Sequence, residues 1–356
     1  MSLFARTPLK ASSEVEEQNT ALRDSLAARL SRSASEDTWA ELAKAGVLGI
    51  CVPEKLGGLG LGIRESEPVF EVLGDLCRPT RFLESSIIAA GLLDSIGGEE
   101  SRELLRRLTD SDFVIAIVGL EPATAPHLRL DRFAQRCGLS GRAALVLEGV
   151  EADVLLILVR QDARVSLAAV LDKADGLVEH AYPTIDGRMA ADLRFNDATC
   201  VVLADDCSEA LSRVIDQAIA CTAIEAAALM TRLVEDTASF ARDRAQFGQP
   251  IGSFQVVQHR LVDMYIAARR AGAIARRAMA GLEHCKVQRA ALASAAKVTI
   301  AETGRYVGQQ AVQLHGAIGT TYEHPVSRYF KRLTAVEQQL GDSDMHVKRY
   351  AANAFV

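Results

Sequence analysis

Apolar and polar positions divide this chain into three stretches of different texture. Residues 14 to about 110 have helical spacing, and residues 35–46 combine a Ser/Asp start with a glycine stop. From residue 113 onward the apolar residues form short runs that turn residues separate. These runs lie at 114–118, 143–147, 154–159, 165–171 and 191–195. The pattern predicts a small β-domain that follows a helical one.

Helical periodicity returns near residue 208 and continues to the end of the chain. Leu211, Val214 and Ala218 keep a period of about 3.6 residues, which places them on one helix face. Alanine-rich stretches further on suit close helix packing, so we expect four long helices in a bundle. The predicted fold class is α+β. Its parts are an N-terminal helical domain (1–112), a middle β-domain of sandwich or barrel type (113–206) and a C-terminal four-helix bundle (207–356).

Composition narrows the classes of function. The 356 residues carry a net charge of −6, which is not the basic balance of a nucleic-acid binder. The seven cysteines are scattered without a CxxC pair and the histidines lack metal-ligand spacing, so we expect no disulfide framework and no metal site. No signal-peptide core is visible, and the longest apolar runs are too short to span a bilayer. We therefore expect a cytoplasmic protein without membrane or nucleic-acid partners.

Three segments carry recognisable motifs. Residues 244–255 combine an arginine, an aromatic residue, turn glycines and a proline between two helical stretches. Residues 313–319 precede Glu323-His324-Pro325, and residues 52–62 read VPEKLGGLGLG. Together these segments resemble the signatures of the acyl-CoA dehydrogenase family, in the same order along the chain. Residues 307–316 and 329–334 are similar to a diverged branch, which includes small subunits of pimeloyl-CoA-type dehydrogenases and subunits of heteromeric steroid side-chain dehydrogenases.

The resemblance implies that flavin adenine dinucleotide (FAD) lies between the β-domain of one subunit and the bundle of its neighbour. Arg244 would face the pyrophosphate, where a guanidinium donates two charge-assisted hydrogen bonds. Gln246 and Phe247 would flank that contact. The remaining implied contacts are Phe254 and Gln255 along the adenosine, and Gln313 and Gly316 on the other side. The plainer alternative is a helix-capping arginine followed by a packed Phe-Gly turn.

The ring-binding part of the resemblance is incomplete. Active family members carry Thr-Glu-Pro where this chain has residues 120–122, Leu-Glu-Pro, and the Gly-Ser-Asp that normally follows is absent. The Trp-Ile-Thr at the flavin ring aligns with residues 145–147, Leu-Val-Leu. The usual catalytic carboxylate aligns with Leu340, and the alternative base position aligns with Ala218.

A relocated catalytic base is one hypothesis for this chain. Glu225 lies seven residues after Ala218, nearly on the same helix face but about 10 Å further along the axis. Its carboxylate stands in an apolar stretch, as a general base could. The alternative is a carboxylate paired across the bundle or an interface. Asp342 and Glu337, near the lost base position, are weaker candidates.

Two arginine pairs, Arg269-Arg270 and Arg276-Arg277, repeat at an interval of seven residues. Such a stripe is usually a solvated helix face. The alternative is a contact with CoA phosphates or with an acidic partner.

The bundle keeps the pattern that implies ADP binding, whereas the β-domain lacks the pattern that implies ring binding. The sequence therefore predicts one subunit of a heteromeric FAD-dependent acyl-CoA dehydrogenase, whose bundle completes a flavin site on a homologous partner subunit. The resemblance implies α,β-dehydrogenation of a CoA thioester and an electron-accepting flavoprotein as a further partner. The alternatives are a self-sufficient homo-oligomer with Glu225 as base and a non-catalytic scaffold.

Overall fold

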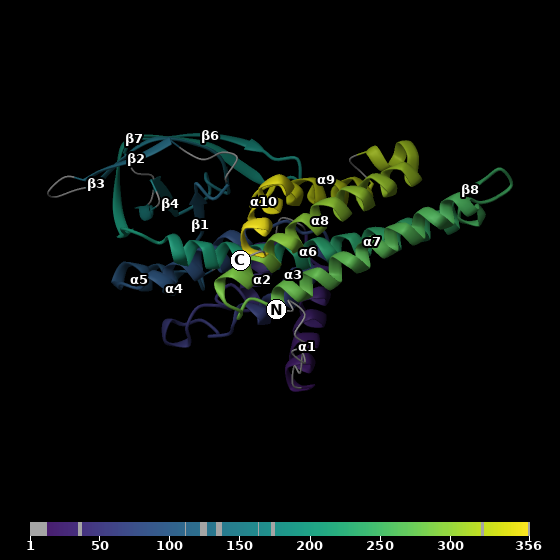
Figure 1. Ribbon diagram of the computed structural model, residues 1–356, viewed down its shortest axis with the longest axis horizontal. Helices are drawn as coiled ribbons and strands as arrows, with labels where there is room; N and C mark the ends of the chain where they lie inside the picture. Colours follow the sequence, from purple (N-terminus) through teal and green to yellow (C-terminus); the bar gives the residue numbers. More distant parts are fainter. Residues whose placement is uncertain are drawn as a thin grey trace.

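The computed structural model describes residues 13–354 except 35–37, 111, 122–126, 133–136, 163, 172–174 and 322–323. A helical part, a β-domain and a second helical part follow one another along the chain (Figure 1). This order confirms the predicted α+β fold, while the division at residues 112 and 206 stays a prediction. The helix start expected at residues 35–37 lies outside the described part of the chain.

The N-terminal part consists of short helices. These are α1 (Ser13–Leu30), α2 (Thr38–Lys44), α3 (Glu67–Asp75), α4 (Ala90–Ile96) and α5 (Glu99–Arg107), with 3-10 turns η1 (Glu54–Leu56) and η2 (Ile63–Ser66). A π-helical turn, η3 (Leu83–Ala89), leads directly into α4, and all its residues are buried. Such turns are rare and often lie at functional positions. Here the turn places the Glu84 carboxylate in the protein interior.

The β-domain is one twisted sheet that curves over its own core. Its strands are β1 (Ile115–Val118), β2 (His127–Arg132), β3 (Cys137–Leu147), β4 (Val154–Gln161), β5 (Arg164–Leu171), β6 (Leu177–Pro183) and β7 (Met189–Ala204). The strand order is β1-β4-β5-β7-β3-β2, and β6 pairs with the first half of β7. Of the described strand pairs in this sheet, only β1 and β4 run parallel.

Strand β4 lies between two hydrophobic cores. Leu156 and Leu158 point into the core shared with the helices, whereas Leu155 and Ile157 point into the core of the β-domain. A strand that is buried on both faces has an unbroken apolar run, which is why the sequence predicted it. Strand β6 was not predicted, because most of its side chains are exposed and it has no apolar face to reveal it.

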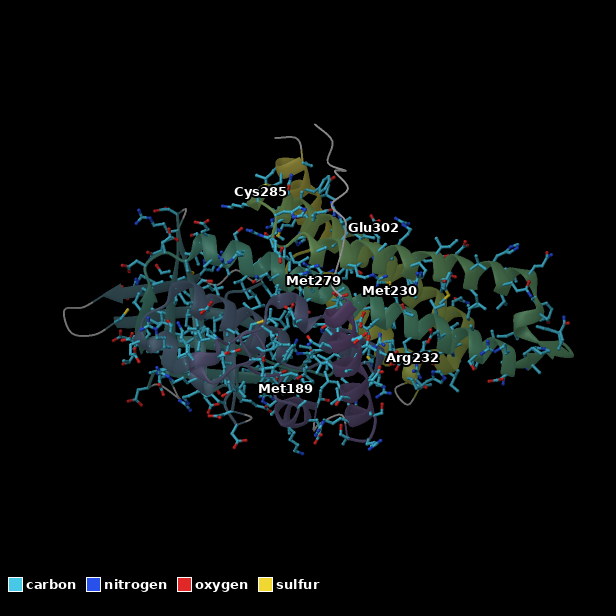
Figure 2. All side chains as sticks on the ribbon, turned by 90° about the horizontal axis from the view of Figure 1, so that it is seen from below. Met189, Met230, Arg232, Met279, Cys285 and Glu302 are labelled. Carbon is cyan, nitrogen blue, oxygen red and sulfur yellow. The ribbon has the colours of Figure 1, made fainter. Side chains whose placement is uncertain are left out.

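The C-terminal bundle contains the long helices α6 (Ser208–Asp243), α7 (Gln255–Ala280) and α8 (Lys286–His315). Met230 and Met279 lie in its interior (Figure 2). By length and composition α6 resembles a membrane span, but 78% of the apolar window is buried inside the protein, as in a core helix. The hairpin of β8 (Ala245–Gln246) and β9 (Gln249–Pro250) and the turn η5 (Ile251–Ser253) connect α6 to α7 and project from the end of the bundle (Figure 1).

Two shorter helices occupy the fourth side of the bundle, where the sequence predicted one long helix. They are α9 (Pro325–Gln338) and α10 (Ser343–Ala354). The turn η6 (Gly316–Thr320) follows α8 and precedes α9 in the chain. Leu340 and Gly341 have φ angles of 62° and 100°, which a right-handed helix does not allow. The break between α9 and α10 therefore falls at the position that aligns with the family's catalytic carboxylate.

Candidate functional site

The turn that carries the first motif is a tight hairpin at the end of the bundle. Gln246 pairs with Gln249, and the two residues between them, Phe247 and Gly248, have φ angles of 55° and 82°. Two central residues with positive φ are typical of a type I′ turn, which explains the glycine. Phe247 is 91% exposed and contacts only the ring edge of Phe254 among the described aromatic pairs. The packed Phe-Gly turn of the plainer alternative is therefore not what the structure shows.

The side chains expected to contact the ADP half of FAD lie at this end of the bundle, and most are open to solvent, whereas Phe254 is half-buried. Arg244, Gln246, Gln255 and Gln313 are exposed. The guanidinium of Arg244 has no ion pair with any described residue, and the residue joins the end of α6 through its backbone N–H, which donates to Phe240. A polar face of this kind is available to a ligand, and the ADP contacts stay predictions.

A stack of aromatic rings holds the two motif segments together. The Phe240 ring, in the last turn of α6, lies 4.2 Å from the His315 ring at the end of α8. His315 Nδ1 is 2.8 Å from the carbonyl oxygen of Ala311, and His324 caps the start of α9 by accepting from the Val326 backbone. The neighbouring Gly316, with φ 66°, leaves open space where a Cβ would stand. No motif in the sequence pointed to Phe240. Glu323 of the second motif lies outside the described residues.

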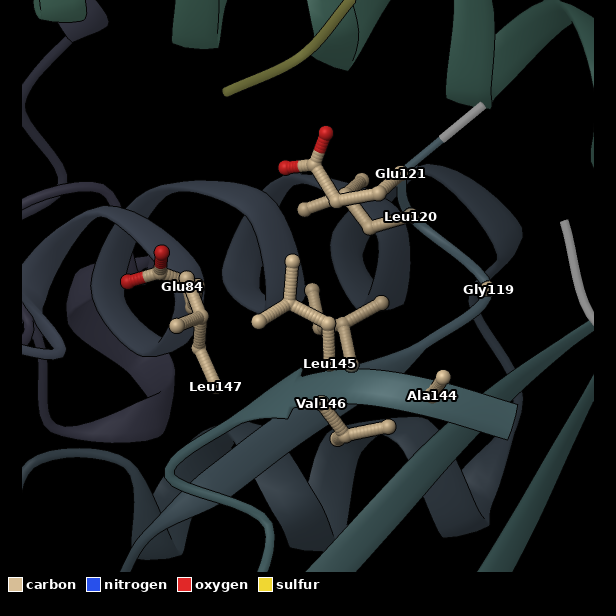
Figure 3. Close-up of a pocket in the computed structure, with 9 residues that line it drawn as sticks. Glu84, Gly119, Leu120, Glu121, Ala144, Leu145, Val146 and Leu147 are labelled. Atoms are coloured by element: carbon tan, nitrogen blue, oxygen red, sulfur yellow. The ribbon is translucent and has the colours of Figure 1, made fainter. Parts of the chain in front are cut away.

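The face of the β-domain that aligns with the ring-binding motifs has a small cavity, and Leu145 beside it is 36% exposed. A cavity of about 10 Å³ lies between residues 117–121, residues 144–147 and Glu84 (Figure 3). That volume accommodates about one water molecule, whereas ligand pockets usually measure about 300–1,000 Å³. The side chain of Leu145 points into the space between Glu84 and Glu121 (Figure 3). The residues present here do not fit a flavin ring.

A β-bulge fixes the orientation of Leu145. The register of β3 against β7 shifts between Ala143 and Val146, and Leu145 has a φ angle of 55°. Its backbone N–H donates to Asp192 Oδ1 at 3.1 Å, and the Tyr182 hydroxyl donates to the same oxygen at 2.8 Å. A leucine in the left-handed region is strained, and the surrounding bonds maintain that conformation.

Glu121 connects the face that aligns with the ring-binding motifs to the lost base position. Both its carboxylate oxygens accept from the backbone N–H of Leu340, at 2.9 and 3.1 Å. Burial raises the pKa of Glu121 to about 7, against the effect of that hydrogen bond. Close by, Lys297 is fully buried and donates to the carbonyl oxygens of Val336 and Glu337, at the end of α9. Burial lowers the pKa of Lys297 to about 8, with Glu121 acting in the opposite direction.

Glu225 is one partner in a buried ion pair. Its two oxygens accept from Arg332 Nε and Nη2 at 2.7 and 2.8 Å, and Arg332 Nη1 donates to Asp186 at 2.8 Å. Burial disfavours the charged guanidinium, yet Glu225 and Asp186 together raise the pKa of Arg332. The second of the two sequence interpretations, a carboxylate paired across the bundle, describes this geometry. A role for Glu225 as base stays a prediction.

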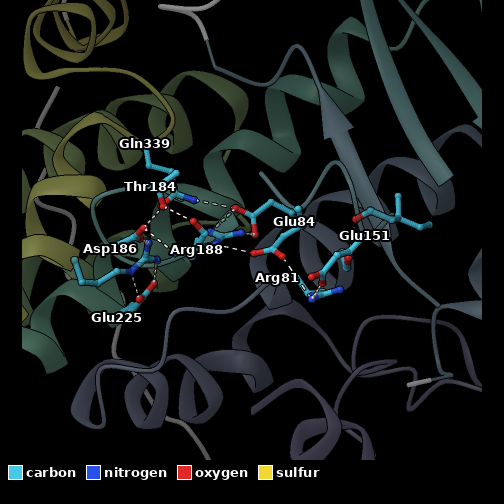
Figure 4. Close-up of polar contacts among 12 residues, drawn as sticks. Arg81, Glu84, Glu151, Thr184, Asp186, Arg188, Glu225 and Gln339 are labelled. Carbon is cyan, nitrogen blue, oxygen red and sulfur yellow. Dashed lines mark hydrogen bonds and ion pairs between the residues drawn. The ribbon is translucent and has the colours of Figure 1, made fainter. Parts of the chain in front are cut away.

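A second buried arginine lies beside the first. Arg188 donates to both oxygens of Glu84, at 3.0 and 2.9 Å, and to Glu148 at 3.3 Å (Figure 4). Gln339 also donates to Glu84, at 3.1 Å. The turn between β6 and β7 supplies Arg188, and with it Asp186, to a junction with η3, α6 and α9. The sequence of this Asp-Gly-Arg stretch is typical of a turn, and nothing local shows that its charges are buried.

The weaker acid candidates also have structural partners. Glu337 accepts from Arg305 Nε at 3.2 Å, and the Asp342 carboxylate accepts from the Met345 backbone at 2.8 Å, at the start of α10. These bonds engage both groups at or near the ends of helices, and neither side chain lines the cavity.

Comparison with known proteins places the whole chain in one group. Residues 15–111 match the profile "Acyl-CoA dehydrogenase, N-terminal domain", and residues 209–355 match "Acyl-CoA dehydrogenase, C-terminal domain". The chain is 29% identical to acyl-CoA dehydrogenase FadE27 of Mycobacterium tuberculosis, over 90% of this chain and 88% of that protein. It is 26% identical to acyl-CoA dehydrogenase IpdE2 of Mycolicibacterium smegmatis, over 95% of this chain and 99% of that one.

Solved structures agree with these matches. A variant of the Tcur3481–Tcur3483 steroid ACAD superposes with a TM-score of 0.85 at 26% identity, covering 96% of this chain and 98% of that one. A chain of the acyl-CoA dehydrogenase from Geobacillus kaustophilus shares the fold, with a TM-score of 0.85 at 21% identity over 98% of this chain and 100% of that one. With both terminal domains matched and the fold shared throughout, this chain belongs to the acyl-CoA dehydrogenase family, in the diverged branch that its motifs predicted.

Proposed function

We propose that this chain is one subunit of an FAD-dependent acyl-CoA dehydrogenase that carries out α,β-dehydrogenation of a CoA thioester together with a second, homologous subunit. One observation carries the proposal: the bundle end that is expected to contact ADP is exposed, while the face that aligns with the flavin-ring motifs has leucines around a cavity of only about 10 Å³. A single chain of this shape has half of a flavin site. The other half, the ring-binding β-domain, would come from the partner.

The bundle end has the chemistry for its half of the task. Arg244 is a cation without an ion pair to any residue that the structure describes, and it stands beside the β8–β9 turn, suited to two bonds with a pyrophosphate. Phe254 supplies aromatic surface for an adenosine, Phe247 flanks the pyrophosphate contact, and Gly316 permits close approach of the backbone. When bound, FAD accepts the hydride in this family's reaction. Among the residues of this chain's β-domain that the structure describes, none takes the place of a ring partner, so the catalytic step is not placed on them.

The relatives support a two-subunit arrangement. The steroid ACAD named above is a pair of gene products, and this chain matches 98% of one of its chains at 26% identity. An electron-accepting flavoprotein would reoxidise the assembled enzyme. The substrate is proposed only as a CoA thioester.

Flavin content tests the proposal directly. The chain is purified alone and after co-expression with a homologous dehydrogenase subunit, and flavin absorbance per chain is measured. We expect no tightly bound flavin for the chain alone and less than one flavin per chain in the complex. One tightly bound FAD per chain with the chain alone would instead favour the self-sufficient homo-oligomer. Absence of flavin from every assembly would favour the scaffold.

A further inference from the structure

Two cysteine side chains stand directly opposite each other in the sheet of the β-domain. Cys137 is the first residue of β3, and its partner across the antiparallel ladder with β7 is Cys200. Strand β3 lies between β2 and β7 in the strand order (Figure 1). Both residues are thiols in the structure, and neither belongs to the candidate flavin site. The strand register therefore places two oxidisable groups side by side.

Both thiols lie on the same face of the sheet. Cys200 is 6% exposed and belongs to the hydrophobic core of the β-domain, and the half-buried Cys137 packs against the same core. Directly opposite residues of an antiparallel pair have Cα atoms about 4.5 or 5.5 Å apart, depending on their hydrogen-bonding pattern. Both values lie inside the range of about 4.4–6.8 Å that a disulfide spans. A bond between the two sulfur atoms therefore needs no rearrangement of the two strands.

The other cysteines have different surroundings. Of the seven cysteines, all of which the structure describes, only Cys137 and Cys200 are partners in a strand ladder. Burial raises the pKa of the Cys51 thiol and of the Cys77 thiol to about 12, so both keep their protons and are poor nucleophiles. Cys285 is exposed and lies outside the sheet, directly before α8. The geometry for a disulfide is therefore particular to the pair in β3 and β7.

We propose that Cys137 and Cys200 form a redox site, which hydrogen peroxide closes to a disulfide and a thiol reductant reopens. Cys137 reacts first, because it is the more accessible of the two. Its thiolate attacks one oxygen of the peroxide, the O–O bond breaks, and the departing hydroxide takes up a proton to become water. The product is a sulfenic acid. The Cys200 thiolate then attacks the Cys137 sulfur, the S–O bond breaks, and a second hydroxide leaves as water.

The reaction converts two thiols and one peroxide into one disulfide and two waters. The two sulfur atoms together lose two electrons, which reduce the two peroxide oxygens. The new bond ties the beginning of β3 to the last part of β7 and closes a loop of about 60 residues, which restricts the unfolded chain. In a compartment rich in thiol reductants such a bond is transient, as in redox-sensing proteins. Oxidation therefore stabilises the β-domain and leaves the bundle end unchanged.

Peptide mapping of the full chain tests the proposal. The reduced protein is treated with hydrogen peroxide, its remaining thiols are alkylated under denaturing conditions, and its proteolytic peptides are analysed by mass spectrometry. We expect a pair of peptides joined through Cys137 and Cys200, and dithiothreitol should separate them. Unlinked peptides at both positions, or a disulfide that joins other cysteines instead, would overturn the proposal.

Two single variants distinguish this pair from general oxidation of the protein. Cys137→Ser should abolish the linked peptides, whereas Cys285→Ser, which removes an exposed cysteine, should leave them unchanged. Peroxide should raise the unfolding temperature of the wild type by about 5 °C and should not raise that of Cys137→Ser. Linked peptides without this rise would show that the bond does not join the folded strands, which contradicts the proposal. Flavin content does not enter these measurements, so they are independent of the proposed function.

Discussion

The guanidinium of Arg332, on α9, holds both carboxylate oxygens of Glu225, on α6, at 2.7 and 2.8 Å. It also binds Asp186 from the β-domain, so a single buried cation joins three elements that are far apart in the sequence. A carboxylate engaged through both oxygens is held as a structural partner. The neighbouring Arg188 repeats this arrangement toward the N-terminal helices.

Replacing Glu225 by glutamine tests whether the group is structural. Glu225→Gln should lower the free energy of unfolding by about 3 kcal/mol, because the buried Arg332 loses one of its two charged partners. Urea unfolding measures the change, with Glu235→Gln on the exposed side of the same helix as the control. Unchanged stability together with loss of turnover in the assembled enzyme would instead identify Glu225 as the base.

Arg188→Met should lower the free energy of unfolding by about 3–5 kcal/mol. The substitution leaves the carboxylates of Glu84 and Glu148 buried without this cation. The loss should be smaller at pH 5 than at pH 8, since burial raises the pKa of Glu148 and protonation removes its charge. Chemical unfolding at both pH values checks this, with the exposed Arg164→Met as control. A loss of equal size at both pH values would contradict the expectation.

Glu121 should make the protein less stable as the pH rises through neutrality. Its pKa is raised in the folded state, to about 7 from 4.5, so the folded state binds the proton more tightly. The stabilisation is complete below about pH 4.5 and is lost as the pH rises to 7. Relative to Glu121→Gln, the wild type should lose about 2 kcal/mol between pH 5 and pH 7.5. If both proteins lose stability in parallel as the pH rises, Glu121 is not the group responsible. Lys297, whose pKa is lowered to about 8, stays largely charged in this pH range.

Arg244→Ala should leave assembly with a partner subunit intact and weaken flavin binding about 10–100-fold, the loss expected for hydrogen bonds to a charged group. Flavin retained after gel filtration of the complex measures the effect. Arg242→Ala, an exposed arginine two residues earlier, is the matched control and should keep its flavin. Equal retention by both variants would remove Arg244 from the site.

Local patterns made much of this protein predictable. The apolar run of β4, the period of α6 and the turn residues of the hairpin at Phe247 each reflect interactions between near neighbours in the chain. The motif at residues 244–255 is also a local pattern, and its resemblance to a family signature implied contacts with the ADP half of FAD. The exposure of its side chains is known only from the fold. The polar strand β6 has no such pattern, because most of its side chains are exposed. Its strand conformation comes from backbone pairing with β7.

Contacts between distant segments determined the rest. Nothing near Glu225 in the sequence points to Arg332, which is 107 residues away. Nothing near Asp186 and Arg188 shows that the charged side chains of this exposed turn are buried against other parts of the fold. The break at Leu340 is likewise held by Glu121 from another domain. A charge is recognised as paired, and a pocket as closed, only when the chain has folded, because pairing and volume depend on which remote groups meet in space.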